Sequence, residues 1–478
     1  MSHVTMVFGY TLSTNAWYFD STYDDLASPC IVTAGGLMSF GEAAARARRL
    51  RAFITSRLPD APSHEPARVA YVAHPDPDVH VLFLALFGMG LTAVPLHPKL
   101  TRAEVDVLSS VARPDLVLDA DEIARAADDT SYDSGGPERA PAPDPESPAT
   151  IVFTSGTTGR PKGALLSRRA FLASARASAQ VLGWQPDDRW FLCMPLAHVG
   201  GLGVLVRCLL AKKSVIHFGR RAFEPRSALD LMETSGATIA SLVPTMLARF
   251  VEANASPNRA LRIALLGGAA ASPALVEKGR ALGWPLVVTY GLTEACSHVT
   301  LGGTSDTGRH VGTPIPGTEV RIVDEQITVR SATLFSGYVD QGPLQLDVDG
   351  FYATGDLGEI DGEGRLAIHA RRTDLVVTGG ENVYPREVEL LVEEIHGVRE
   401  AAVFGVPDET WGQIVALAVV IEPGGPDLAS IVARLKERTA PHKRPRLGAV
   451  VEALPTNTLG KLVRPRLSEI VPRLERLS

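Results

Sequence analysis

One short segment, rich in glycine and hydroxyl side chains, has the residue types and spacing best suited to chemistry. It reads Thr154-Ser-Gly-Thr-Thr-Gly-Arg-Pro-Lys-Gly163 and directly follows the apolar run 151–153. Glycines allow a sharp turn whose backbone N–H groups point at one spot, and the Lys162 ammonium adds a positive charge. The hydroxyl groups can donate hydrogen bonds or bind a metal ion. Such a loop is suited to a polyphosphate.

This loop matches neither of two well-known phosphate-binding patterns. A Walker A loop requires Gly-Lys followed by Ser or Thr, whereas Lys162 lies between Pro161 and Gly163. The segment is not a Gly-x-Gly-x-x-Gly pattern either. A polar surface turn would explain any few of these residues, but not the whole ordered segment.

The composition indicates a globular protein and excludes several other classes. Of the 478 residues, 45% are hydrophobic, 21% charged and 6% aromatic, which excludes a disordered, fibrous or collagen-like chain. Lys and Arg total 47 and Asp and Glu 54, so the net charge of −7 argues against nucleic acid as a partner. The cysteines lie far apart without a Cys-x-x-Cys pair, so we expect free thiols in a reducing cytoplasm.

No segment is expected to insert into a membrane. The most apolar run, 81–94, contains glycines and is shorter than the ~20 residues that a bilayer requires, so a buried helix leading into a strand is expected. The first residues lack a basic segment followed by an apolar one, so no signal peptide is expected. We therefore expect a cytoplasmic protein.

The elements that must position the loop follow a regular order. From about residue 68, short β-branched runs alternate with helical patterns, which is typical of parallel sheets covered by helices. The expected strands are 69–73, 92–96, 116–118, 151–153, 214–218, 238–242, 262–266 and 286–289. The expected helices are 78–90, 102–112 with Thr101 as N-cap, 167–182, 226–234 and 273–282. The proline-rich stretch 128–149 is expected to be an exposed connection.

The pattern changes after Gly303. Adjacent strands and turns such as 361–364 predict an antiparallel β unit. An α/β pattern then resumes, with helices at 385–395 and 428–439 and strands at 401–406 and 414–421. We predict an α/β fold with a large domain (1–371) of helix-covered parallel sheets plus a β subdomain. A small mobile α+β domain (372–478) completes the prediction.

The loop is accompanied by further segments whose order resembles the acyl- and aryl-adenylating enzymes, which include acyl-CoA ligases, luciferases and peptide-synthetase adenylation domains. They are Gly267-Gly-Ala-Ala270, Tyr290-Gly-Leu-Thr-Glu294, Thr354-Gly-Asp356, Arg371-Arg-Thr-Asp374, Gly379-Gly-Glu-Asn-Val-Tyr-Pro385 and Pro455-Thr-Asn-Thr-Leu-Gly-Lys461. The resemblance covers nearly the whole chain from about residue 25. It implies the adenylate-forming fold and an AMP-forming acid–CoA ligase, which makes acyl-AMP from ATP and a carboxylic acid and then transfers the acyl group to CoA.

The same resemblance implies which residues hold ATP. They are Thr154, Ser155, Gly156, Thr157, Thr158, Gly159 and Lys162 in the loop, with Gly268, Ala269, Ala270, Tyr290, Gly291, Thr293, Asp356 and Arg371. Within this set, Tyr290 and the 268–270 backbone would enclose adenine, and Asp356 would accept the ribose hydroxyls. Mg²⁺ is the implied cofactor, held by Glu294 with the Thr154 hydroxyl nearby.

The resemblance also implies how the reaction is catalysed. The acid itself is the nucleophile, so catalysis must come from alignment and charge neutralisation around phosphorus. The implied catalytic residues are Lys461, Glu294, His198 and Arg371. Lys461 would bridge the carboxylate and the α-phosphate. Rotation of the small domain would then remove it and bring Gly379 and Gly380 against the pantetheine of CoA.

Within the superfamily, the segments 240–247, 264–270 and 290–297 most resemble 2-succinylbenzoate–CoA ligases of menaquinone synthesis. The substrate would be an aromatic dicarboxylate, and the implied acyl-pocket residues are His198, Gly200, Gly267, Thr289 and Ser297. A ligase for another aryl or medium-chain acid and an adenylating enzyme that loads a carrier protein stay open, as does a homodimer. A non-catalytic nucleotide-binding relative is disfavoured, because Thr154, Lys162, Glu294, Asp356 and Lys461 are all present.

Overall fold

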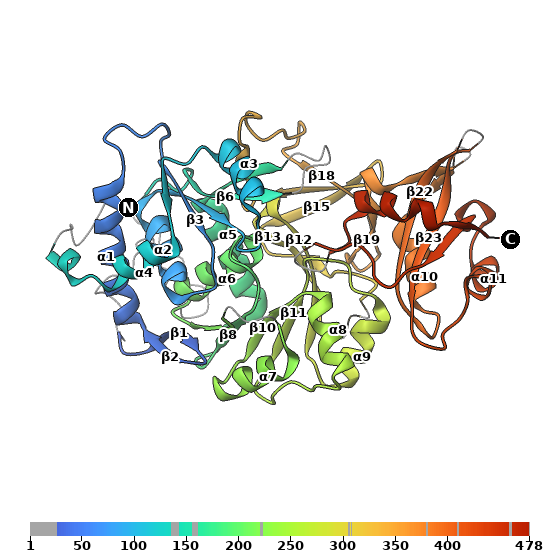
Figure 1. Cartoon of the computed structure of the whole chain (residues 1–478), viewed down its shortest axis with the longest axis horizontal. Coiled ribbons are helices and arrows are strands. Elements are labelled where there is room, and N and C mark those ends of the chain that lie inside the picture. The colour runs from blue at the N-terminus through green and yellow to red at the C-terminus, as the bar shows by residue number, and fades with distance from the viewer. Residues whose placement is uncertain are drawn as a thin grey trace.

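The computed structural model describes residues 26–134, 143–154, 161–219, 223–304, 306, 308–378, 381–408, 411–457 and 461–477. Figure 1 shows a large α/β body, coloured blue to yellow, and a smaller body in orange and red that contains the C-terminal end of the chain. The predicted fold class is confirmed, since parallel sheets with helices precede an antiparallel sheet and a C-terminal α+β unit.

The first sheet carries the predicted phosphate loop and has the strand order β17-β7-β6-β4-β3-β5. Its strands are β3 (Arg68–Val72), β4 (Thr92–Leu96), β5 (Leu116–Leu118), β6 (Pro148–Thr154), β7 (Lys162–Ser167) and β17 (Gly337–Tyr338). The strands β5, β3, β4 and β6 are parallel, whereas β7 pairs antiparallel with both β6 and β17. The predicted strands of this region are thereby confirmed.

The helices of this region are α1 (Phe40–Arg57), α2 (Pro77–Met89), α3 (Arg102–Ala112), α4 (Ala120–Asp128) and α5 (Arg168–Leu182). Thr101 caps α3 as predicted, because its hydroxyl accepts a hydrogen bond from the backbone N–H of Glu104. In the stretch predicted to be an exposed connection, Thr130–Ser134 forms a short 3₁₀ helix, and Thr130, Ser131 and Asp133 in it are exposed. The Asp133 carboxylate pairs with Arg49 of α1, a long-range contact that local composition does not indicate.

The second sheet has the order β14-β13-β12-β11-β10-β8-β9-β1-β2. Its strands are β1 (Pro29–Thr33), β2 (Gly36–Ser39), β8 (Arg189–Leu192), β9 (Ser214–His217), β10 (Ile239–Leu242), β11 (Ile263–Leu266), β12 (Leu286–Leu292), β13 (Ser297–Leu301) and β14 (Thr313–Pro314). Its helices are α6 (Val199–Leu210), α7 (Pro225–Thr234), α8 (Pro244–Glu252) and α9 (Pro273–Ala281). Because β8, β10, β11 and β12 are parallel neighbours, the segments that follow them meet at one edge of the sheet.

The predicted antiparallel unit after Gly303 is confirmed. Its strands are β15 (Thr318–Val323), β16 (Gln326–Ser331), β18 (Tyr352–Ile360) and β19 (Leu366–Arg371), in the order β15-β16-β18-β19. The turn between β18 and β19 closes with a hydrogen bond from the N–H of Gly364 to the carbonyl of Asp361.

The C-terminal part has its own sheet and core. Its strands are β20 (Val376–Thr378), β21 (Glu381–Val383), β22 (Val398–Asp408), β23 (Gly412–Ile421), β24 (Leu447–Val450) and β25 (Glu475–Arg476). The helices α10 (Pro385–Glu393) and α11 (Leu428–Arg438) supply Val388, Val392 and Leu435 to an apolar core against β22 and β23. The predicted helices and strands of this region are confirmed.

The four cysteines are free thiols, as predicted. Cys30, Cys208 and Cys296 are buried and Cys193 is half-buried. Burial raises the pKa of Cys30, Cys193 and Cys296 to about 12, and raises that of Cys208 well above its ordinary value. The apolar run 81–94 forms most of α2 and the start of β4, and no helix among the described residues is long and apolar enough to cross a membrane.

Candidate active site

The predicted phosphate loop connects two antiparallel strands. Thr154 ends β6, Lys162 begins β7, and the two residues are partners in the hairpin register. The loop residues Ser155, Gly156, Thr157, Thr158 and Gly159 lie outside the described residues. Gly163 is required by packing, because a Cβ there would lie 2.8 Å from the Cγ2 of Ile151 and 3.1 Å from that of Val339. The glycine thus lets the chain segment at β17 approach the strand that begins with Lys162.

Tyr338 of β17 contacts both Lys162 and Glu294, the predicted metal ligand. The Tyr338 hydroxyl donates a hydrogen bond of 2.6 Å to Oε1 of Glu294. The Nζ atom of Lys162 lies 5.1 Å from the centroid of the Tyr338 ring. Tyr338 was missed by sequence reasoning, since no local spacing relates it to Glu294, which lies 44 residues earlier.

Glu294 lies in a tight turn whose geometry depends on glycine and on left-handed backbone. The turn begins as a 3₁₀ helix, η2 (Thr293–Ala295), and the candidate ATP residue Thr293 is its first residue. It continues through Cys296, which has φ 51°, and Ser297, which has φ 93°. A Cβ at Gly291 would lie 1.8 Å from the carbonyl oxygen of Ser297, so only glycine fits there. Left-handed conformations are rare for residues with a side chain and concentrate at functional sites.

Buried side chains also hold the backbone of the turn that contains Glu294. Arg207 of α6 donates a hydrogen bond of 3.0 Å from Nη2 to the Ser174 hydroxyl, which in turn donates one of 2.9 Å to the carbonyl of Cys296. Burial lowers the pKa of the Arg207 guanidinium to about 10, which still leaves it charged at neutral pH. A buried cation therefore fixes the backbone of the Glu294 turn through one hydroxyl group.

The predicted adenine and ribose residues are directly connected. Tyr290 of β12 donates a hydrogen bond of 2.6 Å from its hydroxyl to Oδ2 of Asp356, and both residues are buried. The Thr354 hydroxyl accepts a further bond of 3.1 Å from the N–H of Asp356. Asp356 of β18 is paired in register with Arg371 of β19, of which the structure describes the backbone. The second and third sheets therefore meet at these residues.

The segment 267–270 follows β11 and lies beside Tyr290 because β11 and β12 are adjacent parallel strands. A Cβ at Gly267 would lie 2.6 Å from the Cγ2 of Thr289, so the backbone after β11 is packed closely against β12. Gly268 has φ +81°, a conformation that favours glycine. Ala269 is half-buried and Ala270 exposed. The Thr289 hydroxyl donates to the carbonyl of Thr300, so it is used in pairing β12 with β13.

The predicted acyl-pocket histidine follows β8 and immediately precedes α6. His198 has a buried Nε2 atom with no partner among the described residues, and its ring lies 5.8 Å from that of His97. Burial and the nearby His97 lower the pKa of His198 to about 4, so its imidazole is neutral at neutral pH. Gly200 lies under Met194, whose Cε would be 2.4 Å from an added Cβ. Ser297 is 9% exposed.

Lys461 belongs to the C-terminal part and is exposed. Its backbone N–H donates to the Asn457 side chain (3.0 Å), and its carbonyl accepts from the N–H of Asn457 (2.9 Å). Arg464 anchors the following segment by an ion pair of 2.8 Å with the buried Glu389. The predicted CoA residues Gly379 and Gly380 lie outside the described residues.

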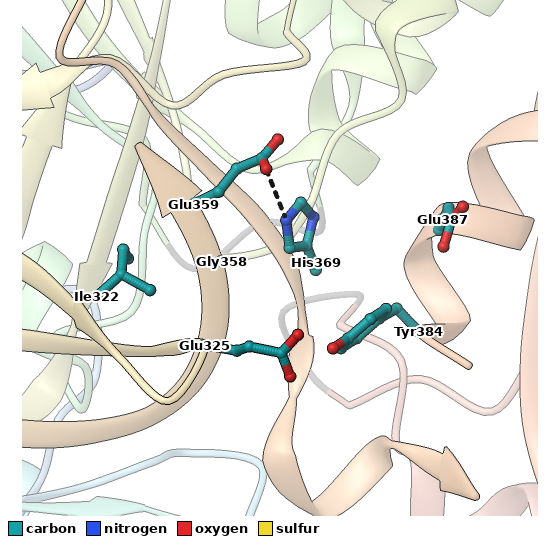
Figure 2. Close-up of a pocket in the computed structure, with 7 residues that line it drawn as sticks. All are labelled: Ile322, Glu325, Gly358, Glu359, His369, Tyr384 and Glu387. Atoms are coloured by element: carbon teal, nitrogen blue, oxygen red, sulfur yellow. Dashed lines mark ion pairs between the residues drawn. The ribbon is translucent and has the colours of Figure 1, made fainter. Parts of the chain in front are cut away.

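A cavity of about 530 Å³ lies between the third sheet and the start of α10. Its described lining residues are Ile322, Glu325, Gly358, Glu359, His369, Tyr384 and Glu387. Figure 2 shows the Tyr384 hydroxyl directed at the Glu325 carboxylate across the cavity. Burial and the bond to Glu325 raise the pKa of Tyr384 to about 12, so its hydroxyl stays protonated. The cavity lies between the large body and the C-terminal part. None of the described residues that line it is a predicted ATP-binding residue.

Comparison with known proteins identifies the class to which this fold and site belong. The family model of the AMP-binding enzymes matches residues 23–339, and the model of the AMP-binding enzyme C-terminal domain matches 387–461. The chain therefore belongs to the AMP-binding enzyme family. The 2-succinylbenzoate–CoA ligase of Enterococcus faecalis is 30% identical over 430 residues, which cover 84% of this chain and 88% of that protein.

Solved structures agree with this classification. The o-succinylbenzoate CoA synthetase of Bacillus subtilis, in complex with the acyl-adenylate OSB-AMP, has a TM-score of 0.81 and 27% identity, covering 92% of this chain and 95% of that one. A structure of the same enzyme in complex with ATP and a magnesium ion has a TM-score of 0.80 at 27% identity, covering 92% and 96%. ATP-bound MatB of Rhodopseudomonas palustris has a TM-score of 0.85 at 29% identity, covering 95% and 98%.

Proposed function

We propose that this protein is an AMP-forming acid–CoA ligase whose acid is 2-succinylbenzoate, an intermediate of menaquinone synthesis. A carboxylate oxygen of the acid attacks the α-phosphorus of ATP and pyrophosphate leaves, which gives the acyl-adenylate. The CoA sulfur then attacks the acyl carbon, loses its proton and displaces AMP. The observations that carry the proposal are the contacts of Tyr338 with both Lys162 and Glu294, together with the hydrogen bond between Tyr290 and Asp356.

The residues at the loop fit a magnesium ion bound together with nucleotide. Among the described residues, no group of three or more His, Cys, Asp or Glu could hold a metal ion alone. Mg²⁺ is commonly bound through one or two carboxylates and substrate phosphates, and Glu294 with the Thr154 hydroxyl supplies such a partial set. When bound, the ion would neutralise charge on the phosphates. The loop residues 155–159 and Lys162 would bind the phosphate oxygens.

We propose that other residues bind the nucleoside and the α-phosphate of ATP. The Asp356 carboxylate is proposed to accept hydrogen bonds from the ribose hydroxyls, and the 268–270 backbone with Tyr290 and Gly291 to enclose adenine. Lys461 and Arg371 are proposed to neutralise the charge that develops at the α-phosphate. Because Lys461 is carried by the C-terminal part, adenylation requires that part to close over the large body.

The acyl pocket is proposed to comprise His198, Gly200, Gly267, Thr289 and Ser297. A neutral His198 cannot supply a positive charge, so it would serve the dianion as a hydrogen-bond donor. Glycine at 200 and 267 lets Met194 and Thr289 pack closely against the segments that follow β8 and β11, and these packed segments would form the wall of the pocket. The named ligases among the relatives support succinylbenzoate over other aryl or medium-chain acids and over loading of a carrier protein.

We further propose that residues 1–371 and 372–478 are the two moving domains. The contact between Glu325 and Tyr384 and the ion pair between Arg309 and Glu394 (3.4 Å) join the two parts in this arrangement. For the CoA step, Gly379 and Gly380 would face pantetheine. Cytoplasmic location is proposed because both co-substrates, ATP and CoA, are available there.

A substrate panel tests this proposal. ATP–pyrophosphate exchange should be fastest with 2-succinylbenzoate, and mass spectrometry should detect its CoA thioester. Benzoates or fatty acids that surpass it by orders of magnitude would contradict the proposed acid. Exchange without any CoA thioester, when free CoA is supplied, would favour the carrier-loading alternative.

A further inference from the structure

A short chain segment connects the lysine strand to the Glu294 turn by backbone hydrogen bonds. The N–H of Phe335 donates to the carbonyl of Glu294 (2.8 Å), and the N–H of Val339 donates to that of Gly163 (2.9 Å). Between these bonds, β17 pairs antiparallel with β7 through Tyr338 and Ala164. The segment 335–339 is therefore attached both to the strand that carries Lys162 and to the turn that carries Glu294.

The side chain of Tyr338 contacts the charged groups of both Glu294 and Lys162. Its hydroxyl donates to Oε1 of Glu294, and the face of its ring lies 5.1 Å from the Lys162 ammonium. The ring of Phe335 packs against it at 4.9 Å in an edge-on arrangement, which fixes its orientation.

We propose that Tyr338 is a positioning residue that sets the Glu294 carboxylate and the Lys162 ammonium in place before nucleotide binds. The inference rests on the proposed function, in which these two groups receive Mg²⁺ and the phosphates. A hydrogen bond at Oε1 restricts rotation of the carboxylate and leaves Oε2 for the ion. The ring face holds a flexible lysine side chain that would otherwise lose more entropy on binding ATP.

The two functions of Tyr338 can be separated by two substitutions. Tyr338→Phe removes the bond to Glu294 and keeps the ring beneath Lys162. Tyr338→Leu removes both. ATP binding is measured by calorimetry in the absence of acid, once with Mg²⁺ and once with EDTA, so that no turnover contributes.

For Tyr338→Phe we expect the gain in ATP affinity from Mg²⁺ to fall about tenfold, because a bond to a charged group is lost. Its affinity in EDTA should stay within about twofold of wild type, since the ring still contacts Lys162. For Tyr338→Leu the affinity in EDTA should also fall, by about threefold.

The matched control is Tyr71→Phe. The Tyr71 hydroxyl is buried in β3 with no partner among the described residues, so its removal should change neither affinity. A Tyr338→Phe protein with the full Mg²⁺ gain would overturn the inference. A wild-type protein that binds Mg²⁺-ATP but forms no acyl-CoA would instead overturn the proposed function.

Discussion

The hydroxyl of Tyr290 and the carboxylate of Asp356 form a hydrogen bond of 2.6 Å across two sheets. Tyr290 comes from the last strand of the parallel series in the second sheet, and Asp356 from the antiparallel unit. The bond orients a buried carboxylate at the point where we propose that the ribose binds. The proposed nucleoside site would therefore depend on the packing of two separate sheets.

Removal of either partner should weaken ATP binding. We expect Asp356→Ala to raise the KM for ATP about 100-fold and Tyr290→Phe about tenfold, because charge-assisted hydrogen bonds are lost. The KM for CoA should not change. Steady-state kinetics with each co-substrate varied measure both values, and Asp349→Ala, an exposed acid of the same unit, is the control. An unchanged KM for ATP in Tyr290→Phe would show that the bond does not support nucleotide binding.

Substitution of Lys461 should affect chemistry rather than binding. Lys461→Ala is expected to slow single-turnover formation of acyl-adenylate by about 100-fold, because a charge that neutralises the transition state is removed. The equilibrium affinity for ATP should stay nearly constant. The exposed Lys278 on α9 is the matched control, since Lys278→Ala removes the same charge from another surface. A Lys461→Ala protein with the wild-type adenylation rate would exclude the proposed role.

A double-mutant cycle tests the close packing of Gly267 against Thr289. In Gly267→Ala, the new Cβ meets the Cγ2 of Thr289, whose displacement should raise the KM for the acid about tenfold with little effect on ATP. Thr289→Ser removes that methyl group and keeps the hydroxyl bond to Thr300. The double variant should therefore regain most of the affinity for the acid. Additive losses in the double variant would contradict this explanation.

The buried histidines predict acid sensitivity. Burial lowers the pKa of His198 and His217 to about 4, and burial with the adjacent His217 lowers that of His80 well below 6.5. The unfolded chain therefore binds protons below pH 6.5 that the folded chain does not, so stability falls as the pH drops from 6.5 towards 4. The urea midpoint of unfolding, measured across this range, should fall less steeply in His80→Leu. Equal slopes in both proteins would refute the contribution of His80.

The sequence pattern predicted the elements better than it predicted the contacts between them. Strands such as β10 and β11 are indicated by short apolar runs between helical patterns, since both faces of a parallel sheet are buried. The hydroxyl- and glycine-rich loop was visible because its residues are contiguous. The partners Tyr290 and Asp356 lie 66 residues apart, and each was predicted as a ligand residue without the bond between them.

Two features had no signal in the sequence. Tyr338 lies in a two-residue strand whose pairing with β7 depends on tertiary packing. The left-handed conformations at Cys296 and Ser297 occur in residue types that do not usually adopt them, so composition gave no indication of the turn. Both features surround Glu294, where local sequence preference is overridden by the surrounding structure.

Three of the four natural thiols are buried and the fourth is half-buried, which makes this protein convenient for optical measurements of the proposed domain movement. A thiol with a raised pKa is scarcely ionised at pH 7 and reacts slowly with maleimide dyes. Cysteines introduced at the exposed positions Glu233 on α7 and Glu437 on α11 would then take up a donor and an acceptor fluorophore without prior removal of the native residues. Energy transfer between them would follow the large body and the C-terminal part through a single catalytic cycle.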